Sequence, residues 1–399
     1  MKRISLQLGV VIWALAFLMC PLWRTVAAEP LRVGIILPLT GEKKAFGEIE
    51  RNSFLMALDE INKAGGVRGA EITLIFEDDK GKPEVAKAVA EKLISKDKVL
   101  MLGGGYGSSE TYAIGGVAQQ RKVPFLINTG SADKITEQGW TYVFRLNPPV
   151  SEYSIAAESF LREVAKPKTA AILFENTLFG SSGSKEFEIS CKKMGVRVVF
   201  EGGYEHGAKD FKTLLLKVKN AKPDLVYMIS YVLDASLLMQ QAMELDMNPG
   251  LFMGGGAGFT LPEFYEMAGK AAEGVFSANL WVPNLPYPGA GDYYANYKNR
   301  YGKETEYHGA EAYAAMFVIA DVLKRAKSFS PEDMRQALKA TDLMTVFGRV
   351  RFLSYGKKIN QNRLPTYLVQ WVEGKLECVW PKELATAQYI FPHRPWNQR

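Results

Sequence analysis

Cysteine and histidine are scarce in this sequence, with three residues of each among 399. The three histidines, His206, His308 and His393, lack the spacing of metal-binding motifs, which disfavours a metal site. The motifs GxGxxG, GxxxxGK[ST] and GxSxG are also absent. The usual signatures of dinucleotide-binding enzymes, phosphate-loop enzymes and serine hydrolases are therefore missing, so a binding protein is favoured over an enzyme and no cofactor is expected.

Strong charge and long apolar runs are lacking as well. The formal net charge is +6, and it would fall to +3 without Lys2, Arg3 and Arg24 at the N-terminus. Basic and acidic residues are interspersed, so no nucleic-acid partner is expected. Beyond residue 22 no stretch is apolar enough to predict a membrane span, so we expect the mature protein not to be embedded in a membrane.

The N-terminus has the pattern of a secretory signal peptide. Lys2 and Arg3 precede an apolar stretch at residues 10–22, and small residues at 26–28 predict cleavage after Ala28. A membrane anchor is the alternative, but the apolar stretch is short for a span of about 20 residues. A lipoprotein anchored through Cys20 is disfavoured because Met19 stands where a small residue is expected. We therefore expect residues 1–28 to be removed on export.

Residues 31–79 predict a βαβ unit. An apolar run rich in Val and Ile at 31–37 is typical of a buried strand. A helical pattern with Phe54, Leu58 and Ile61 on one face follows and ends at two glycines. A second strand-like run at 72–76 completes the unit. Parallel sheets bind ligands at the carboxyl ends of their strands, so the loop at residues 38–47 is the first candidate binding loop.

Strand-like and helix-like runs alternate along nearly the whole chain. Two similar α/β blocks, at about residues 30–147 and 150–275, each predict a doubly wound sheet. Residues 293–340 are mostly helical in pattern, and strand-like composition returns from residue 347. Cys191 and Cys378 remain after removal of the leader, and they could either pair or stay as buried free thiols.

A series of short motifs carries a family resemblance across essentially the whole mature chain. The chain resembles the type I periplasmic solute-binding proteins of ABC importers, in the branched-chain (Leu/Ile/Val) amino-acid group. The motifs are GIILPLTG at 34–41, NKAGGV at 62–67, EDD at 77–79, GSS at 107–109, FG at 179–180, DF at 210–211, PD at 223–224, AEG at 272–274 and FG at 347–348. Each is weak alone, but their order behind a signal peptide is specific.

The resemblance implies two Rossmann-like doubly wound lobes joined by three crossovers, an arrangement known as a Venus flytrap. The crossovers are expected near residues 147–149, 277–280 and 348–352. Lobe one would then comprise residues 29–147 plus 278–348, and lobe two residues 148–277 plus 349–399. A monomer that works with the membrane subunits of an ABC permease is expected.

The resemblance also implies where the ligand carboxylate binds on lobe one. Ser108 matches a serine that contacts this carboxylate, between a strand and a helix N-terminus that favour an anion. Gly130, Ser131 and Ala132 match a second contacting loop. The family usually has threonine at the position of Ala132, and Ser131 is a candidate for the missing hydroxyl. The alternative for Ser108 is a role as helix N-cap only.

Aromatic residues are implied to complete the site. Phe46 matches an aromatic residue in the loop after the first strand, and Phe179 and Tyr231 match residues of lobe two that close over the ligand. Tyr106 could also reach the cleft and limit the size of the pocket. The alternative for each is an ordinary core position.

One position departs from the family pattern. Amino-acid binders of this group carry a glutamate that pairs with the ligand ammonium, and here the matching residue is Gly256. A buried ammonium without a partner is costly. Either another acid such as Asp234 or Glu175 replaces the glutamate, or the ligand lacks an α-amino group. The glycine-rich loop also leaves room for a larger ligand.

The expected function is capture of a small carboxylate-bearing ligand, either a hydrophobic amino acid or a related organic or aromatic acid, for an ABC permease. A ligand-sensing module for a membrane receptor is one alternative, and a binder of amide-type or urea-type ligands is another.

Overall fold

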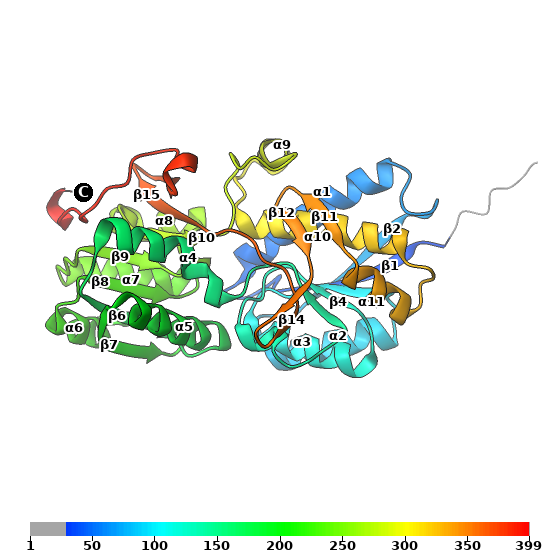
Figure 1. The fold of residues 1–399 in the computed structure, drawn as a ribbon, viewed down its shortest axis with the longest axis horizontal. Helices are drawn as coiled ribbons and strands as arrows, with labels where there is room; N and C mark the ends of the chain where they lie inside the picture. The colour runs from blue at the N-terminus through cyan, green and yellow to red at the C-terminus, as the bar shows by residue number, and fades with distance from the viewer. Residues whose placement is uncertain (1–28, 399) are drawn as a thin grey trace, which may run out of the picture.

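The computed structural model describes residues 29–398, so the expected signal peptide lies outside the described residues. Two seven-stranded sheets form the centres of two lobes that lie side by side (Figure 1). Within the described residues, no helix combines the length and the apolar character that crossing a bilayer requires.

The first sheet has the order β13-β14-β5-β4-β3-β1-β2. Its strands are parallel except for the β13–β14 hairpin. Helix α1 packs along α10, and α2 packs along α3. The elements of this lobe are β1 (Leu31–Leu37), α1 (Lys44–Lys63), β2 (Ile72–Asp78), α2 (Pro83–Ser95), β3 (Met101–Gly104), α3 (Ser108–Arg121), β4 (Phe125–Ile127), β5 (Val143–Arg145), α9 (Ala290–Tyr301), α10 (Tyr307–Arg325), α11 (Pro331–Lys339), β13 (Leu353–Tyr355) and β14 (Lys358–Gln361).

The second sheet has the order β16-β15-β10-β9-β8-β6-β7. It repeats the plan of the first, because in both sheets the first strand lies between the second and the third. Such an order places a ligand crevice at the carboxyl ends of the strands. The elements are α4 (Val150–Phe160), β6 (Thr169–Glu175), α5 (Leu178–Met194), β7 (Arg197–Tyr204), α6 (Lys212–Ala221), β8 (Leu225–Ile229), α7 (Val232–Glu244), β9 (Leu251–Gly254), α8 (Pro262–Ala268), β10 (Phe276–Asn279), β15 (Tyr367–Val372) and β16 (Lys375–Trp380).

The predicted doubly wound fold is confirmed, and so is the mostly helical segment at 293–340. A small two-stranded sheet of β11 (Asp342–Thr345) and β12 (Gly348–Arg351) accompanies the lobes. Cys191 and Cys378 are both buried free thiols, so the alternative of a disulfide is wrong.

Strand pairing moves two of the expected lobe boundaries. Strand β10 belongs to the second sheet through Asn279, so the chain leaves that sheet two residues later than expected. Strands β13 and β14 pair in the first sheet, although residues 349–399 were assigned to lobe two. The third crossover therefore follows Gln361 and does not lie near residues 348–352.

A buried arginine explains why the β13–β14 hairpin joins the first sheet. Arg145 at the end of β5 is fully buried, and its Nε donates to Oε1 of Gln361 at 2.6 Å. The Gln361 amide also donates to the backbone oxygen of Asn147 at 2.7 Å. A buried guanidinium needs acceptors for its N–H groups, and β14 supplies one from a residue more than 200 positions away.

Gln361→Ala should lower the free energy of unfolding by about 2–3 kcal/mol, because it removes a buried hydrogen bond to a charged group. Urea denaturation of the mature protein measures this change. Gln120→Ala, at an exposed position at the end of α3, is the matched control. A variant as stable as the wild type would contradict the role given to Gln361.

Candidate functional site

Loops at the carboxyl ends of both sheets meet around one small cavity. Five of the residues expected from the sequence line it, namely Tyr106, Ser108, Ser131, Phe179 and Tyr231. Its other lining residues are Thr129, Tyr153, Ala257, Tyr307 and His308. A larger hollow lies between α9 and the β15–β16 hairpin, and it reaches Asn279 at the end of β10. The smaller cavity is the candidate site because both lobes contribute their strand-end loops to it.

Ser108 and the loop after β4 form a polar cradle on lobe one. Ser108 is the first residue of α3, and its Oγ accepts a hydrogen bond from the Ala132 backbone N–H at 3.1 Å. The N-cap residue of α3 is Gly107, so the alternative that Ser108 serves as the N-cap is wrong. The helix N-terminus and the serine hydroxyl together suit an anion.

Arg145 fixes the shape of this loop. Its Nη1 donates to the backbone oxygens of Gly130 at 3.0 Å and Ala132 at 2.8 Å. At Gly130 a Cβ would lie 2.4 Å from the hydroxyl oxygen of Thr111, so the loop can approach α3 only with glycine there. The carboxylate contacts implied for Gly130, Ser131 and Ala132 stay predictions, and the three residues lie together beside Ser108.

Aromatic rings from both lobes fill the space opposite the cradle. Phe46 stacks on Tyr106 with ring centroids 4.6 Å apart, and Phe179 stacks on Tyr231 at 5.5 Å. The two pairs meet across the lobes, with Tyr106 and Tyr231 5.7 Å apart. The expected convergence of these four side chains is therefore present, while their contact with a ligand remains a prediction.

The hydroxyl of Tyr106 is buried in the cavity without a hydrogen-bond partner among the described residues. Burial also raises the pKa of this phenol well above its ordinary value, so it stays protonated. Buried polar atoms are nearly always hydrogen-bonded. The orphaned hydroxyl is thus available to a polar group of a bound molecule.

Gly256 offers no charge to the cavity. Its φ of +84° is a conformation that glycine adopts readily, and a Cβ there would lie 3.3 Å from the Tyr153 ring. Asp234 and Glu175, the two acids considered as substitutes, are fully buried and do not line the cavity. Both instead face His206. The residues that line the cavity therefore include no carboxylate.

The sequence did not indicate Tyr153, Tyr307, His308 or Thr129 as lining residues. Tyr153 lies on α4, beyond the first crossover, and the Tyr307–His308 pair lies at the start of α10, which follows α9 and not a strand. Tyr307 also joins the lobes, because its hydroxyl accepts a hydrogen bond from the Ala257 backbone N–H at 2.9 Å. A tyrosine at the start of a helix that follows the second crossover could have signalled this contact.

Two buried acids, Glu50 and Glu311, contact the side chain of the lining residue Thr129. The Thr129 hydroxyl is 2.7 Å from Glu50 Oε1 and 2.8 Å from Glu311 Oε2. Burial raises the pKa of Glu50 to about 8, and it raises that of Glu311 well above its ordinary value. At neutral pH both side chains are therefore mainly neutral, and they add little negative charge near a ligand.

A buried ion pair lies at the edge of the cavity. Lys43 Nζ is 3.0 Å from Glu110 Oε1, and it also lies 4.5 Å from the centroid of the Tyr231 ring. Lys43 and Glu110 are on lobe one, so the cation–π contact crosses to lobe two. This contact adds to the attraction between the lobes when they are together.

A two-lobed protein that encloses a small molecule between strand-end loops is the class that this fold and cavity define. The chain belongs to the periplasmic binding protein family, whose family model matches residues 30–375. The resemblance seen in the sequence is thereby confirmed.

Curated relatives cover nearly the whole chain. Leu/Ile/Val-binding protein homolog 8 of Brucella suis biovar 1 (strain 1330) is 28% identical over 405 residues, which cover 97% of this chain and 98% of the relative. Leu/Ile/Val-binding protein homolog 7 of Brucella abortus (strain 2308) is 29% identical, covering 92% of this chain and 95% of the relative.

Solved structures share the fold at lower identity. The leucine-binding protein LivK of Thermotoga maritima MSB8 matches with a TM-score of 0.81 and 24% identity, covering 87% of this chain and 97% of that one. The LivJ protein of Streptococcus pneumoniae in complex with isoleucine matches with a TM-score of 0.80 and 22% identity, and the match covers 91% of this chain and 100% of that one. A solute-binding protein of R. palustris in complex with benzoate matches with a TM-score of 0.78 and 18% identity, and the match covers 90% of this chain and 97% of that one.

Glu50→Gln should stabilise the protein more at pH 8 than at pH 5. The pKa of Glu50 in the folded protein is about 8, against an ordinary value near 4.5. The folded state therefore binds this proton more tightly than the unfolded state, and wild-type stability falls as pH rises between these values. Glutamine mimics the neutral acid. The difference in free energy of unfolding between Glu50→Gln and the wild type should therefore shift in favour of the variant by about 2–4 kcal/mol between pH 5 and pH 8.

Urea denaturation at the two pH values measures this difference. Glu48→Gln, at a half-buried position on the opposite side of α1, is the control. An equal effect of Glu50→Gln at both pH values would show that Glu50 is not held as a neutral acid.

Proposed function

We propose that this protein is exported through its N-terminal signal peptide and captures a small carboxylate-bearing ligand for delivery to an ABC permease. The observation that supports this most directly is the cradle of Ser108 and the Ala132 N–H at the N-terminus of α3, which faces the aromatic rings of lobe two. A carboxylate in this cradle would accept hydrogen bonds and benefit from the helix dipole. Membership in the periplasmic binding protein family supports the same function.

The ligand is proposed to lack an α-amino group. No Asp or Glu is among the residues that line the cavity, and Gly256 occupies the position at which amino-acid binders of this group carry a glutamate. An ammonium enclosed here would have no carboxylate partner, and an unpaired buried charge costs several kcal/mol. A neutral or carboxylate-only ligand avoids this cost.

An aromatic or similarly flat apolar body fits the walls best. Six of the lining side chains are aromatic rings of Phe, Tyr or His, and stacking on such rings favours a flat partner. The Tyr106 hydroxyl could additionally form a hydrogen bond with a polar substituent of such a ligand. Among proteins of the same fold, one binds isoleucine and another binds benzoate, so the fold itself permits either ligand class.

Binding is proposed to proceed through opening and closure of the lobes. The lining side chains named above are nearly all buried in the closed arrangement, so a ligand can reach them only when the lobes part. A ligand held by Ser108 on lobe one and by the rings of Phe179 and Tyr231 on lobe two would favour closure, because it gains contacts only in the closed state.

A thermal-shift screen tests the ligand class. Benzoate-like acids and the deaminated analogues of leucine, valine and phenylalanine should raise the melting temperature, whereas the parent amino acids should have little effect. A ligand at about 100 times its dissociation constant adds roughly 2.7 kcal/mol of stability, which such a screen detects easily. Short amides serve as controls without a carboxylate.

Strong stabilisation by leucine or valine, with none from the deaminated acids, would contradict the proposed ligand class. It would indicate that a carboxylate such as Glu175 or Asp234 enters the cavity in the bound state.

Ser108→Ala should weaken the best carboxylate from that screen by roughly 1–3 kcal/mol, since it deletes a hydrogen bond to a charged group. This corresponds to about a 5- to 150-fold rise in the dissociation constant measured by calorimetry. Ser181→Ala, at an exposed position in the first turn of α5, is the control. Unchanged affinity in Ser108→Ala would remove this residue from the site.

A further inference from the structure

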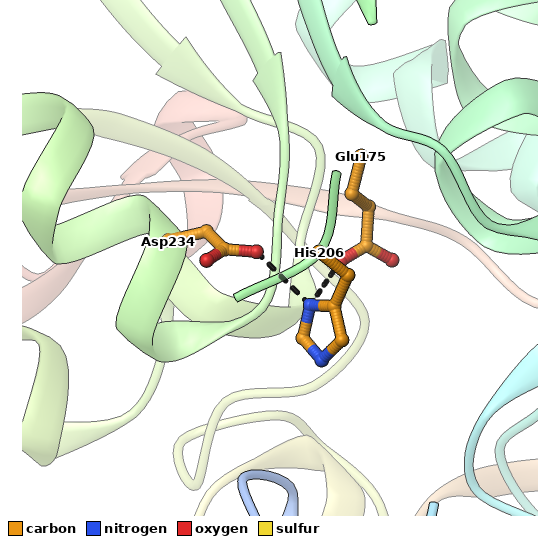
Figure 2. Close-up of side chains that lie close together, drawn as sticks. All are labelled: Glu175, His206 and Asp234. Atoms are coloured by element: carbon orange, nitrogen blue, oxygen red, sulfur yellow. Dashed lines mark hydrogen bonds and ion pairs between the residues drawn. The ribbon is translucent and has the colours of Figure 1, made fainter. Parts of the chain in front are cut away.

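A second cluster of functional groups lies on lobe two, outside the ligand cavity. Glu175, His206 and Asp234 point toward a common centre (Figure 2). Glu175 is the last residue of β6, His206 follows β7, and Asp234 is in the first turn of α7, directly after β8. The sheet order β7-β6-β8 brings these three strand ends together, although the residues are about 30 positions apart in sequence.

The three side chains offer one nitrogen and two oxygens at short range. His206 Nδ1 lies 3.0 Å from Asp234 Oδ2 and 3.2 Å from Glu175 Oε2. All three atoms lie within 4.8 Å of one another. Zinc bonds of 2.0–2.2 Å in tetrahedral geometry separate ligand atoms by about 3.4 Å. Both distances to His206 Nδ1 are within a few tenths of an ångström of this separation.

The outer contacts orient the same three atoms inward. The second oxygen of Glu175 accepts a hydrogen bond from the Thr177 hydroxyl at 2.6 Å, and Asp234 Oδ1 accepts one from the Gly207 N–H at 3.1 Å. His206 Nε2 lies 3.0 Å from a carboxylate oxygen of Glu42. A histidine that binds a metal almost always has its other ring nitrogen hydrogen-bonded in this way, often to a carboxylate.

The charge of the cluster is unbalanced without an ion. Both Glu175 and Asp234 are fully buried, and both acids share the single nitrogen His206 Nδ1. No Lys or Arg in residues 29–398 forms an ion pair with either acid. A charged His206 ring leaves a net charge of −1 and a neutral ring leaves −2. A divalent ion with a neutral ring would bring the three side chains to zero.

We propose that Glu175, His206 and Asp234 bind one divalent transition-metal ion such as Zn²⁺, with a water molecule in the fourth position. A mixed nitrogen and carboxylate ligand set suits Zn²⁺, and the histidine disfavours Mg²⁺ and Ca²⁺, which prefer oxygen ligands alone. His206 is one-quarter exposed, which provides a path for the ion. This proposal is independent of the ligand proposed for the cavity.

Glu42, which contacts the second ring nitrogen of His206, couples the proposed metal site to closure of the lobes. Glu42 lies in the β1–α1 loop of lobe one, whereas the three metal ligands belong to lobe two. Coordination at Nδ1 fixes Nε2 as an N–H donor, which Glu42 accepts only when the lobes are together. Metal binding and closure should therefore favour each other.

Calorimetric titration of the untagged, chelator-treated mature protein with ZnCl₂ tests the proposal. One ion should bind per chain, and Co²⁺ should give the visible absorption of a coordinated ion. His206→Gln and Asp234→Asn should weaken Zn²⁺ by more than the about 10–100-fold that loss of an outer contact costs. Glu42→Gln, which removes an outer contact, should weaken Zn²⁺ binding by a factor within that range of about 10–100-fold. Glu205→Gln and His393→Gln, which alter an acid and a histidine outside the cluster, should bind as the wild type does.

Absence of Zn²⁺ binding by folded wild-type protein would overturn the proposal, and so would unchanged affinity in His206→Gln. The Co²⁺ spectrum of the wild type needs no variant to fold, so the site remains testable even if Asp234→Asn is unstable. Circular dichroism of each variant establishes that it is folded before titration.

Discussion

Contact between aromatic rings across the cleft is the interaction on which the closed arrangement depends. Phe46 and Tyr106 on lobe one meet Tyr231 and Phe179 on lobe two in a continuous series of ring contacts. These rings are nearly fully buried, and both lobes contribute to the cluster. Opening the cleft would expose them to water at a cost proportional to their apolar area. In the proposed function, a ligand inserted between the pairs would replace ring–ring contact with ring–ligand contact, and closure on it would keep this burial.

The neutrality of the cavity results from how charge is arranged around it. Lys43 is paired with Glu110, and Glu50 and Glu311 are held mainly neutral by burial. Asp79, whose pKa burial raises to about 7, lies near the same ion pair. Fixed charges are thus paired or suppressed, and the cradle at Ser108 is made of a hydroxyl, backbone N–H groups and a helix N-terminus. Such a cradle attracts an anion without a counter-ion and gives no support to a cation.

Much of the fold could be predicted from the sequence because hydrophobic periodicity and strand-end loops are local signals. The family resemblance singles out Ser108, Phe179 and Tyr231, and each of them lies shortly after a strand, where parallel sheets bind ligands. The β13–β14 hairpin was assigned to the wrong lobe because its place depends on Gln361 reaching Arg145, a pairing that no local pattern contains. The lining residues on helices, such as Tyr153 and Tyr307, were missed for the same reason.

The histidine cluster shows why spacing in the sequence is a poor guide within parallel sheets. Residues that follow adjacent strands converge even when a whole helix separates them along the chain, as Glu175, His206 and Asp234 do. Metal motifs recognised by close spacing belong to helices and tight turns, in which neighbours in sequence are neighbours in space. In a doubly wound lobe the relevant spacing is one β–α repeat, about 30 residues here. His206 then faces two acids of its own lobe and one acid of the other, so the contacts of a single ring depend both on local charge and on the relative position of the lobes.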